Sequence, residues 1–306
     1  MSTPAPATPP APAARRGALL ALVALTLIWS YNWIVMKQAL AYAGPFTFSA
    51  LRYVGGTTVL FALLALKRES LAPPPWRPTL AIGLAQTTGF QALVQWALVH
   101  GGAGKTALLA YTMPFWTVLL AWLLLRNRPR RAQWISIALA ALGLLLVLEP
   151  WRGVGDFGSA ALAIAGGLAW AIGTVLAKRV FDRHAISALR LTAWQMLAGT
   201  VALVVLALVI PERAVAWTPD LLAALAYNVL LASGIGWALW LTVVQRLPAA
   251  LAGLTSLAIP VAGVLFAWAL LGERPDAAET AGIALIALAL LTLLRARRTD
   301  QSPAST

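Results

Sequence analysis

The sequence predicts an all-α integral membrane protein with ten transmembrane helices, arranged as two inverted five-helix repeats with both termini in the cytoplasm. Three observations support this prediction: the composition, the recurrence of long apolar runs, and a set of residues that repeats between the two halves. Hydrophobic residues make up 60% of the 306 positions and charged residues 11%, whereas soluble domains carry about 25% charged residues. The mean hydropathy is +0.80. Lipid rather than water is therefore the main solvent of this fold.

Ten apolar runs are long enough to cross a hydrocarbon core of roughly 30 Å. We expect the spans at residues 17–40, 45–66, 79–99, 104–125, 132–148, 157–177, 186–210, 219–244, 249–271 and 277–294. Within lipid each segment must satisfy its own backbone hydrogen bonds, so these runs are expected to be helices. Their length excludes barrel strands, which need only about ten residues.

The two ends of the chain differ from the apolar runs between them. Residues 1–16 are mostly Ala, Pro, Thr and Ser, too poor in packing side chains to fold, so we expect a disordered cytoplasmic tail there. Arg15 and Arg16, which precede the first apolar run, resemble the start of a signal peptide. That run is too long and continues into Trp29 and Trp33, so we interpret it as a retained helix. Residues 295–306 form a second cytoplasmic tail.

The basic residues orient the chain. With the N-terminus in the cytoplasm, 17 Lys and Arg residues lie on the cytoplasmic side, five lie on the opposite side, and Arg52 lies within a span. This bias follows the positive-inside rule. The net charge of +13 does not indicate a nucleic-acid partner, because the basic residues form short clusters between apolar runs rather than one solvated face.

The residue inventory excludes several kinds of chemistry. Cysteine is absent and the only histidines are His100 and His184, so we expect no disulfide, metal site or cofactor. We also expect no catalytic residues, because Ser30, Ser233 and Ser256 have no histidine partner at membrane depth. The alternative class, a channel or a sensor subunit, requires a continuous polar ring or an appended soluble domain. The sequence contains neither.

A repeat relates the two halves of the chain. At an offset of 146 residues the matches are Met113 and Pro114 with Ile259 and Pro260, Trp122 with Trp268, and Arg128 and Pro129 with Arg274 and Pro275. At an offset of 141 residues the matches are Trp29 with Trp170 and Lys37 with Lys178. The repeated unit has five spans, so the second copy enters the membrane from the opposite side. Inverted repeats are the architecture that alternating access uses, which favours transport.

These matches divide the chain into two repeats. We place the first repeat at residues 17–148, a periplasmic connection at 149–156 and the second repeat at 157–294. A duplication with purely structural consequences is the alternative to a transport architecture.

The first span carries a stripe of aromatic and polar residues. Trp29, Asn32 and Trp33 lie at helical spacing and share a face, with Lys37 one position further round. A substrate cavity explains this stripe. Packing between helices, with Lys37 reaching outward to the interface, is the alternative. Arg52 and Lys37 are candidates to balance a substrate carboxylate.

The third span has a polar stripe of Thr87, Gln91 and Gln95 at successive four-residue steps. Lipid penalises such a stripe, so it is expected to face protein or water, where it bonds either a neighbouring helix or the substrate. Gln86 lies on a different face near the midplane and is a further candidate.

The eighth span contributes a second group of candidates. Ser233 and Trp237 share one face, and Tyr227 and Asn228 lie near mid-depth. Trp170, the repeat partner of Trp29, is a further substrate-binding candidate.

Two prolines interrupt the fourth and ninth spans. Pro114 and Pro260 each free a backbone carbonyl from its helical partner, and Tyr111 and Ser256 lie about one turn before them. We predict that the prolines act as gating hinges and that Tyr111 and Ser256 bind substrate. A static kink that improves packing is the alternative.

Together these features resemble the drug/metabolite transporter superfamily, and specifically its EamA family. The matching segments are residues 29–33 with Lys37, 110–114, 257–260, and the helix-ending motif at 271–275. The first-half counterpart of that motif, at residues 125–129, lacks its Gly-Glu pair. The resemblance covers residues 17–294 and implies a ten-span exporter in the bacterial inner membrane, with the third and eighth helices around a central cavity.

The family carries amino acids, drugs, nucleosides and other metabolites. Fourteen tryptophans favour substrates with aromatic or hydrophobic side chains, so we expect amino acids, with drugs or nucleoside-like metabolites as the alternative. No Asp or Glu lies clearly inside a span, and proton coupling usually requires one, so we expect facilitated transport. The expected partners are the small-molecule substrate and the lipid bilayer, and the sequence leaves both a monomer and a homodimer open.

Overall fold

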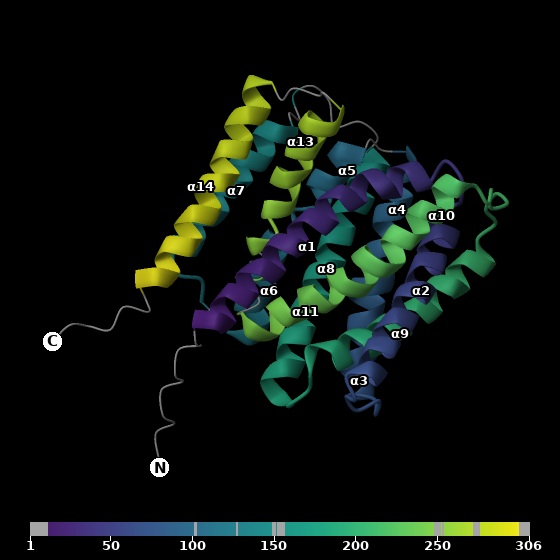
Figure 1. The fold of residues 1–306 in the computed structure, drawn as a ribbon. Coiled ribbons are helices and arrows are strands. Elements are labelled where there is room, and N and C mark those ends of the chain that lie inside the picture. The colour runs from purple at the N-terminus through teal and green to yellow at the C-terminus, as the bar shows by residue number, and fades with distance from the viewer. Residues whose placement is uncertain are drawn as a thin grey trace, which may run out of the picture.

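The computed structural model describes residues 12–100, 103–126, 128–148, 151, 157–247, 252, 254–271 and 276–299. These residues are helical and contain no β-strand, which confirms the all-α prediction (Figure 1). The helices are α1 (Pro12–Ala39), α2 (Pro45–Leu66), α3 (Trp76–Ile82), η1 (Gly83–Gly89), α4 (Phe90–His100), α5 (Ala103–Ala110), α6 (Met113–Leu125), α7 (Arg131–Leu148), α8 (Phe157–Arg183), α9 (Ala188–Val209), α10 (Pro219–Tyr227), η3 (Asn228–Ile235), α11 (Gly236–Arg246), α13 (Ala258–Leu271) and α14 (Ala277–Thr299).

The two ends of the helical region extend beyond the predicted spans. The helix α1 begins at Pro12 and α14 continues to Thr299, so both enter the segments expected to be tails. Residues 1–11 and 300–306, and the predicted connection at 149–156 apart from Trp151, lie outside the described residues.

Five helical stretches are long and apolar enough to cross a membrane. They are Leu20–Ala39, Pro45–Leu66, Phe157–Arg183, Ala188–Val209 and Pro219–Arg246. Shorter apolar helices cover Met113–Leu125, Arg131–Leu146 and Thr280–Ala289. The chain is thus a multi-pass membrane protein, and the count of ten crossings stays a prediction.

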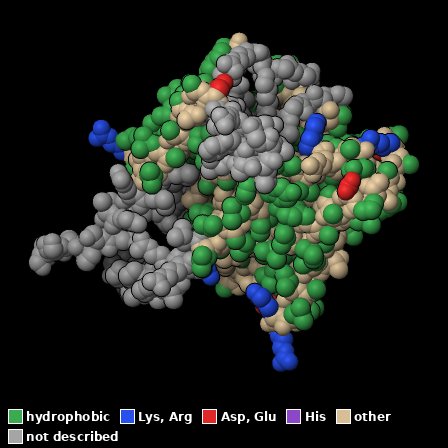
Figure 2. Space-filling view, turned by 45° about the horizontal axis from the view of Figure 1, so that its top comes forward, with side chains coloured by type: hydrophobic (Ala, Val, Ile, Leu, Met, Phe, Trp, Pro, Cys, Tyr) green, Lys and Arg blue, Asp and Glu red, His purple; other side chains and the backbone are tan. Residues whose placement is uncertain are grey.

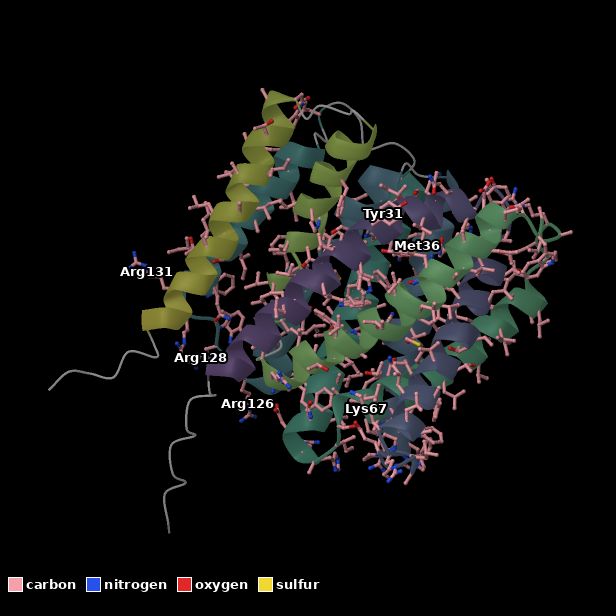
Figure 3. The ribbon with its side chains drawn as sticks, in the orientation of Figure 1. Tyr31, Met36, Lys67, Arg126, Arg128 and Arg131 are labelled. Atoms are coloured by element: carbon pink, nitrogen blue, oxygen red, sulfur yellow. The ribbon has the colours of Figure 1, made fainter. Side chains whose placement is uncertain are left out.

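The outer surface and the charges agree with a membrane environment. Figure 2 shows a face covered largely by hydrophobic side chains, with Lys and Arg at its margins. In Figure 3, Arg126 and Arg128 lie near the places where α1 begins and α14 ends, Arg131 lies at the left edge beside α14, and Lys67 lies toward the lower side of the view.

The helices α2 and α9 are equivalent parts of the two repeats and pack against each other. The helix α2 covers 45 to 66 and α9 covers 188 to 209, an offset of 143 residues at both ends. At one end, Glu212, which follows α9, accepts hydrogen bonds from the backbone amides of Phe46 and Thr47 at the start of α2, both at 2.8 Å. At the other end, Ser187, which precedes α9, donates to Glu69, which follows α2. The two helices therefore run antiparallel, as inverted repeats require.

Each repeat also contains a π-helix at the same place in its third span. The segment η1 packs against α9 and η3 packs against α2, so each π-helix contacts the second helix of the other repeat. Glycines allow this approach: a Cβ on Gly199 would collide with Thr87 of η1, and a Cβ on Gly56 would lie 2.6 Å from the Cβ of Ser233 in η3.

The pseudo-twofold axis passes through the contact of α2 with α9. Thr57 and Thr200 are again 143 residues apart, and their hydroxyl oxygens form a buried hydrogen bond of 3.0 Å. The last helices of the repeats, α7 and α14, also pack together, to one side of the molecule (Figure 1). The core around α8, with Trp170 near its middle, joins the two repeats.

Candidate functional site

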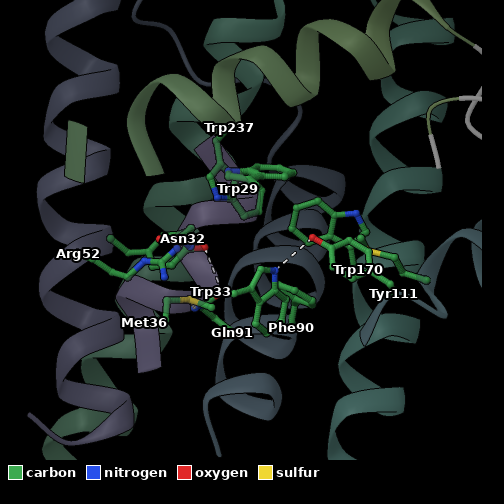
Figure 4. Close-up of a pocket in the computed structure, with 12 residues that line it drawn as sticks. Trp29, Asn32, Trp33, Met36, Arg52, Phe90, Gln91, Tyr111, Trp170 and Trp237 are labelled. Carbon is green, nitrogen blue, oxygen red and sulfur yellow. Dashed lines mark hydrogen bonds between the residues drawn. The ribbon is translucent and has the colours of Figure 1, made fainter. Parts of the chain in front are cut away.

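A cavity lies where the two repeats meet (Figure 4). Its walls come from α1, α2, α4, α8 and α11 and from the junction between α5 and α6. The lining residues are Trp29, Asn32, Trp33, Met36, Arg52, Tyr53, Phe90, Gln91, Tyr111, Met113, Trp170 and Trp237. Eight of them are residues that the sequence singled out as site candidates: Trp29, Asn32, Trp33, Arg52, Gln91, Tyr111, Trp170 and Trp237.

Aromatic rings form one wall of the cavity. Trp170 packs edge-to-face on Phe90, with ring centroids 4.8 Å apart. The ring centroids of Trp170 and Trp237 are 5.2 Å apart. Trp29 lies 5.3 Å from Trp170, its repeat equivalent, and its indole nitrogen donates to the backbone oxygen of Ala232 in η3 at 3.1 Å. Edge-to-face contacts of this kind are favourable beyond the area that they bury. The wall is therefore held in place by both repeats.

Tyr111 lies at the break between α5 and α6. Its hydroxyl accepts a hydrogen bond of 3.2 Å from the indole nitrogen of Trp33 (Figure 4). Pro114 follows in the first turn of α6, where the missing amide of proline costs no hydrogen bond. In the second repeat Pro260 lies in the first turn of α13, and Ser30 donates to the backbone oxygen of Ile259 at 2.8 Å. Both prolines thus start a helix after a break, and hinge motion there stays a prediction.

Arg52 is the one cation among the lining residues that the structure describes. Its side chain is only 3% exposed, its Nε donates to the hydroxyl of Ser233 at 3.2 Å, and its guanidinium carbon lies 4.9 Å from the ring centroid of Tyr53. Its Nη1 has no hydrogen-bond partner among the described residues. No acidic residue lines the cavity in the part of the chain that the structure describes. A buried charge without a counter-ion is costly, so this arrangement requires an explanation other than stability.

The neutral polar groups of the cavity are few. The hydroxyl of Tyr53 donates to Oε1 of Gln91 at 3.4 Å, and Nε2 of Gln91 lies 3.8 Å from the sulfur of Met36. Oδ1 of Asn32 is buried and has no partner in the described part of the chain. The cavity therefore combines a cation and an unused acceptor with apolar walls.

Arg52 has a counterpart in the second repeat. At the offset of 143 residues that relates α2 to α9, Arg52 corresponds to Gln195. Each is bonded to the π-helix that crosses it: Arg52 to Ser233 of η3, and Gln195 Oε1 to the hydroxyl of Thr87 in η1 at 2.9 Å. Gln195 is fully buried and does not line the cavity. The same contact is therefore charged in one repeat and neutral in the other.

Several predicted residues of the third span lie away from the cavity. Gln86 donates to the hydroxyl of Thr174 at 3.0 Å, and Thr87 donates to Gln195. Gln95 is buried outside the lining. The physical reason is the π-helix η1: its hydrogen bonds join residues five apart, so Thr87 does not stay on the face of Gln91 as it would in an α-helix.

The remaining candidates also lie outside the lining. Nδ2 of Asn228 donates to the backbone oxygen of Ala224 at 3.0 Å, and Ser256 is buried beside α13. Lys37 is exposed at the end of α1 and donates to the backbone oxygen of Leu98 at 3.0 Å. Ser233 lies outside the lining and accepts a hydrogen bond from Arg52, which lines the cavity.

Tyr227 lines a different cavity, a groove of about 610 Å³ between α1 and α10. Its hydroxyl donates to the backbone oxygen of Ile28 at 2.6 Å. At the end of the groove the hydroxyl of Tyr42 donates to the Asp220 carboxylate at 2.9 Å, and this bond raises the pKa of Tyr42 above its ordinary value. The described lining of the groove comes from α1, the turn after it and α10, whereas the central cavity also draws on α2, α4, α8 and α11.

Four lining residues were not predicted as site residues: Met36, Tyr53, Phe90 and Met113. All are apolar or aromatic, and a search for polar groups within spans does not find them. Met36 shares the helical face of Trp29 and Asn32, which is the one signal that could have identified it.

The cavity is contracted in this structure. It holds about 40 Å³ of space for solvent, which is room for a few water molecules, whereas ligand sites usually measure about 300 to 1,000 Å³. A ligand of the size of an amino acid therefore requires the lining side chains or the surrounding helices to rearrange.

Comparisons with known proteins agree with the two-repeat architecture. A model described as the EamA-like transporter family matches twice, at residues 15–149 and 158–295. The chain is 34% identical over 289 residues to the uncharacterized protein PA1977 of Pseudomonas aeruginosa. The matched region covers 89% of this chain and 94% of that protein. The chain is 28% identical over 283 residues to the uncharacterized inner membrane transporter YedA of Escherichia coli. That match covers 89% of this chain and 90% of YedA.

A further relative has a more specific description. The chain is 25% identical over 282 residues to a probable amino-acid metabolite efflux pump of Salmonella typhimurium, with 89% of this chain and 92% of that protein covered. A solved crystal structure superimposes with a TM-score of 0.78 at 21% identity and covers 94% of this chain and 99% of that one. At this identity the structure shows a shared fold only.

Proposed function

Because this chain belongs to the EamA-like transporter family, we propose that it exports small metabolites, amino acids with aromatic or hydrophobic side chains above all, across the bacterial inner membrane. The observation that carries this proposal is the central cavity, whose walls are aromatic rings and whose one charge is the guanidinium of Arg52. Aromatic walls favour apolar side chains, and a guanidinium matches a carboxylate. The efflux description of the Salmonella relative supports the substrate class and the direction.

The proposed mechanism is alternating access. The cavity lies on the contact between two repeats whose equivalent helices α2 and α9 run antiparallel, so each repeat presents the same surfaces to opposite ends of the cavity. Relative movement of the repeats can then open one end at a time. The contracted cavity supports this mechanism, because substrate entry and release both require a rearrangement of its walls.

We further propose ten membrane crossings with both termini in the cytoplasm. Five helical stretches reach the length of a span, and the remaining helices overlap the other ranges expected from the sequence. Positive residues gather where α1 begins and α14 ends (Figure 3), which supports a cytoplasmic location for that side. The printed name of the E. coli relative supports an inner-membrane location.

Transport is proposed to be facilitated rather than driven by protons. Coupling to protons usually needs a titratable carboxylate in the membrane, and no acidic residue lines the cavity among the residues that the structure describes. Flux should therefore follow the substrate gradient.

The experiment is uptake of labelled Trp, Phe, Met and Thr into proteoliposomes, with and without a pH gradient. The variants Trp33→Ala and Gln91→Ala alter the cavity, and Trp76→Ala is the matched control, because Trp76 is 66% exposed at the start of α3. We expect gradient-independent flux of several amino acids that falls several-fold in the two cavity variants and stays unchanged in the control.

Other outcomes would replace parts of the proposal. Flux of drugs or nucleosides without amino-acid flux would change the substrate class. Concentrative uptake driven by a pH gradient would overturn the facilitated mechanism. Equal loss in the cavity variants and in Trp76→Ala would move the site elsewhere.

A further inference from the structure

We propose that Arg52 binds the carboxylate of the cargo, so that a carboxylate, and not an amino group, is the feature that every substrate must carry. This inference rests on the proposed transport function and specifies what the same cavity recognises. Three observations support it: the unpartnered Nη1 of Arg52, the neutrality of its repeat equivalent, and the positive charge that Arg52 itself brings to the lining that the structure describes.

The first feature is the way in which the guanidinium is held. Ser233 accepts from Nε at 3.2 Å and the ring of Tyr53 lies 4.9 Å away, so one edge of the guanidinium is fixed. Nη1 is buried and has no partner among the described residues. Figure 4 shows Arg52 reaching toward Asn32 at the side of the cavity. Nη1 of a guanidinium held in this way can donate to an oxygen of an anionic ligand.

The second feature is the comparison with Gln195. The equivalent contact in the other repeat joins Gln195 to Thr87 at 2.9 Å without a charge. Bonding a second-span side chain to a π-helix therefore does not require a guanidinium. Of these two equivalent residues, Arg52 lines the cavity and Gln195 does not, and Arg52 is the charged one. This points to a ligand rather than to packing as the reason for the charge.

The third feature is what surrounds Arg52. A cationic group in the cavity would meet the positive charge of Arg52. Among the described lining residues it would find aromatic faces and neutral acceptors, such as Oδ1 of Asn32, but no carboxylate. Oε1 of Gln91 already accepts from Tyr53. The site is buried and has room for only a few water molecules, so repulsion between two cations is screened less there than in bulk water. An amino group is thus tolerated when a carboxylate accompanies it and is disfavoured alone.

Three ligands with the same aromatic body test this directly: L-phenylalanine, 3-phenylpropionate, which lacks the amino group, and 2-phenylethylamine, which lacks the carboxylate. Binding to the purified full-length protein in detergent is measured by tryptophan fluorescence, because Trp29, Trp33 and Trp170 line the cavity. We expect phenylalanine and phenylpropionate to bind within about tenfold of each other, and phenylethylamine at least tenfold more weakly.

The variants are Arg52→Gln, which copies the second repeat, and Gln195→Met as the matched control at the equivalent position. Arg52→Gln should weaken both carboxylates at least tenfold, a ratio that corresponds to about 1.4 kcal/mol, and should leave phenylethylamine unchanged or improve it. Arg52→Lys should restore part of the carboxylate binding. A variant that merely misfolds would weaken all three ligands together.

The outcomes separate this inference from the proposed function. If phenylethylamine binds as tightly as phenylalanine, or if Arg52→Gln weakens no carboxylate, the inference is overturned while amino-acid transport stands. If phenylpropionate binds through Arg52 but no amino acid binds, the inference stands and the amino-acid substrate class fails. If none of the three ligands binds, both are overturned.

Discussion

Two equivalent contacts differ in one charge. In the first repeat Arg52 of α2 is bonded to Ser233 of η3, and in the second repeat Gln195 of α9 is bonded to Thr87 of η1. Both contacts are buried and both hold a π-helix against the second helix of the other repeat. The difference shows that this contact forms without a charge in the second repeat, which supports the proposal that the guanidinium of Arg52 acts on the cavity. A symmetric scaffold thus carries an asymmetric site.

The largest loss of stability is expected when the contact of Gln195 with η1 is given the charge that Arg52 carries in its contact with η3. Gln195→Arg places a charge at a fully buried position that does not line the cavity. A buried unpaired charge costs about 3 kcal/mol or more, so we expect a clear fall in the thermal unfolding temperature in detergent. An unchanged unfolding temperature would show that this site accepts a charge as readily as that of Arg52, and the comparison would lose its meaning.

The second-largest loss of stability is expected at the glycines where each π-helix packs against the second helix of the other repeat. A Cβ on Gly199 would lie 2.6 Å from the backbone oxygen of Gly83, whereas a Cβ on Gly56 meets mainly the side chain of Ser233. Overpacking costs about 1 to 3 kcal/mol, and a backbone atom cannot move aside easily. We therefore expect Gly199→Ala to destabilise the protein more than Gly56→Ala. The reverse order in unfolding measurements would contradict the packing described at η1.

A smaller effect should appear at the pseudo-twofold axis. Thr57→Val leaves the hydroxyl of Thr200 buried without its partner and should cost about 1 to 3 kcal/mol. The double variant Thr57→Val with Thr200→Val removes both hydroxyls and should be no less stable than the single variant. A double-mutant cycle on unfolding free energies measures this coupling, and strictly additive losses would argue against a shared hydrogen bond.

The smallest effect on stability is expected for Arg52→Gln. The variant removes a buried charge that lacks a counter-ion, and Gln195 shows that a glutamine fits the equivalent contact. Its unfolding free energy should stay within about 1 kcal/mol of the original or rise, because functional residues often reduce stability. A large loss would assign Arg52 a structural role instead.

The sequence predicted much of this arrangement through its repeat. The match of Trp29 with Trp170 anticipated two residues that touch at the centre of the molecule, and the aromatic stripe of α1 does line the cavity. Arg52 was named as a candidate to balance a substrate carboxylate, and it lines the cavity, while its role stays a prediction. Composition and spacing could identify these lining residues because they determine which residues face protein.

Other features could not be predicted from spacing. The π-helices change the register of the third and eighth spans, and this separates Thr87 from the face of Gln91 and directs it to Gln195. The contacts of Glu212 with α2 depend on how distant helix ends meet. Neither feature has a local sequence signal, because both arise from packing between the two repeats.

The most direct test of the central claim is uptake of labelled phenylalanine into proteoliposomes that contain either Arg52→Gln or Gln195→Met at equal protein density. Both variants change the same repeat-equivalent contact, but only the first removes a charge from the cavity. We predict that Arg52→Gln loses at least nine-tenths of the flux, as roughly 1.4 kcal/mol of lost interaction requires, while Gln195→Met keeps most of it. Equal flux in the two variants would contradict the assignment of the cavity as the transport site.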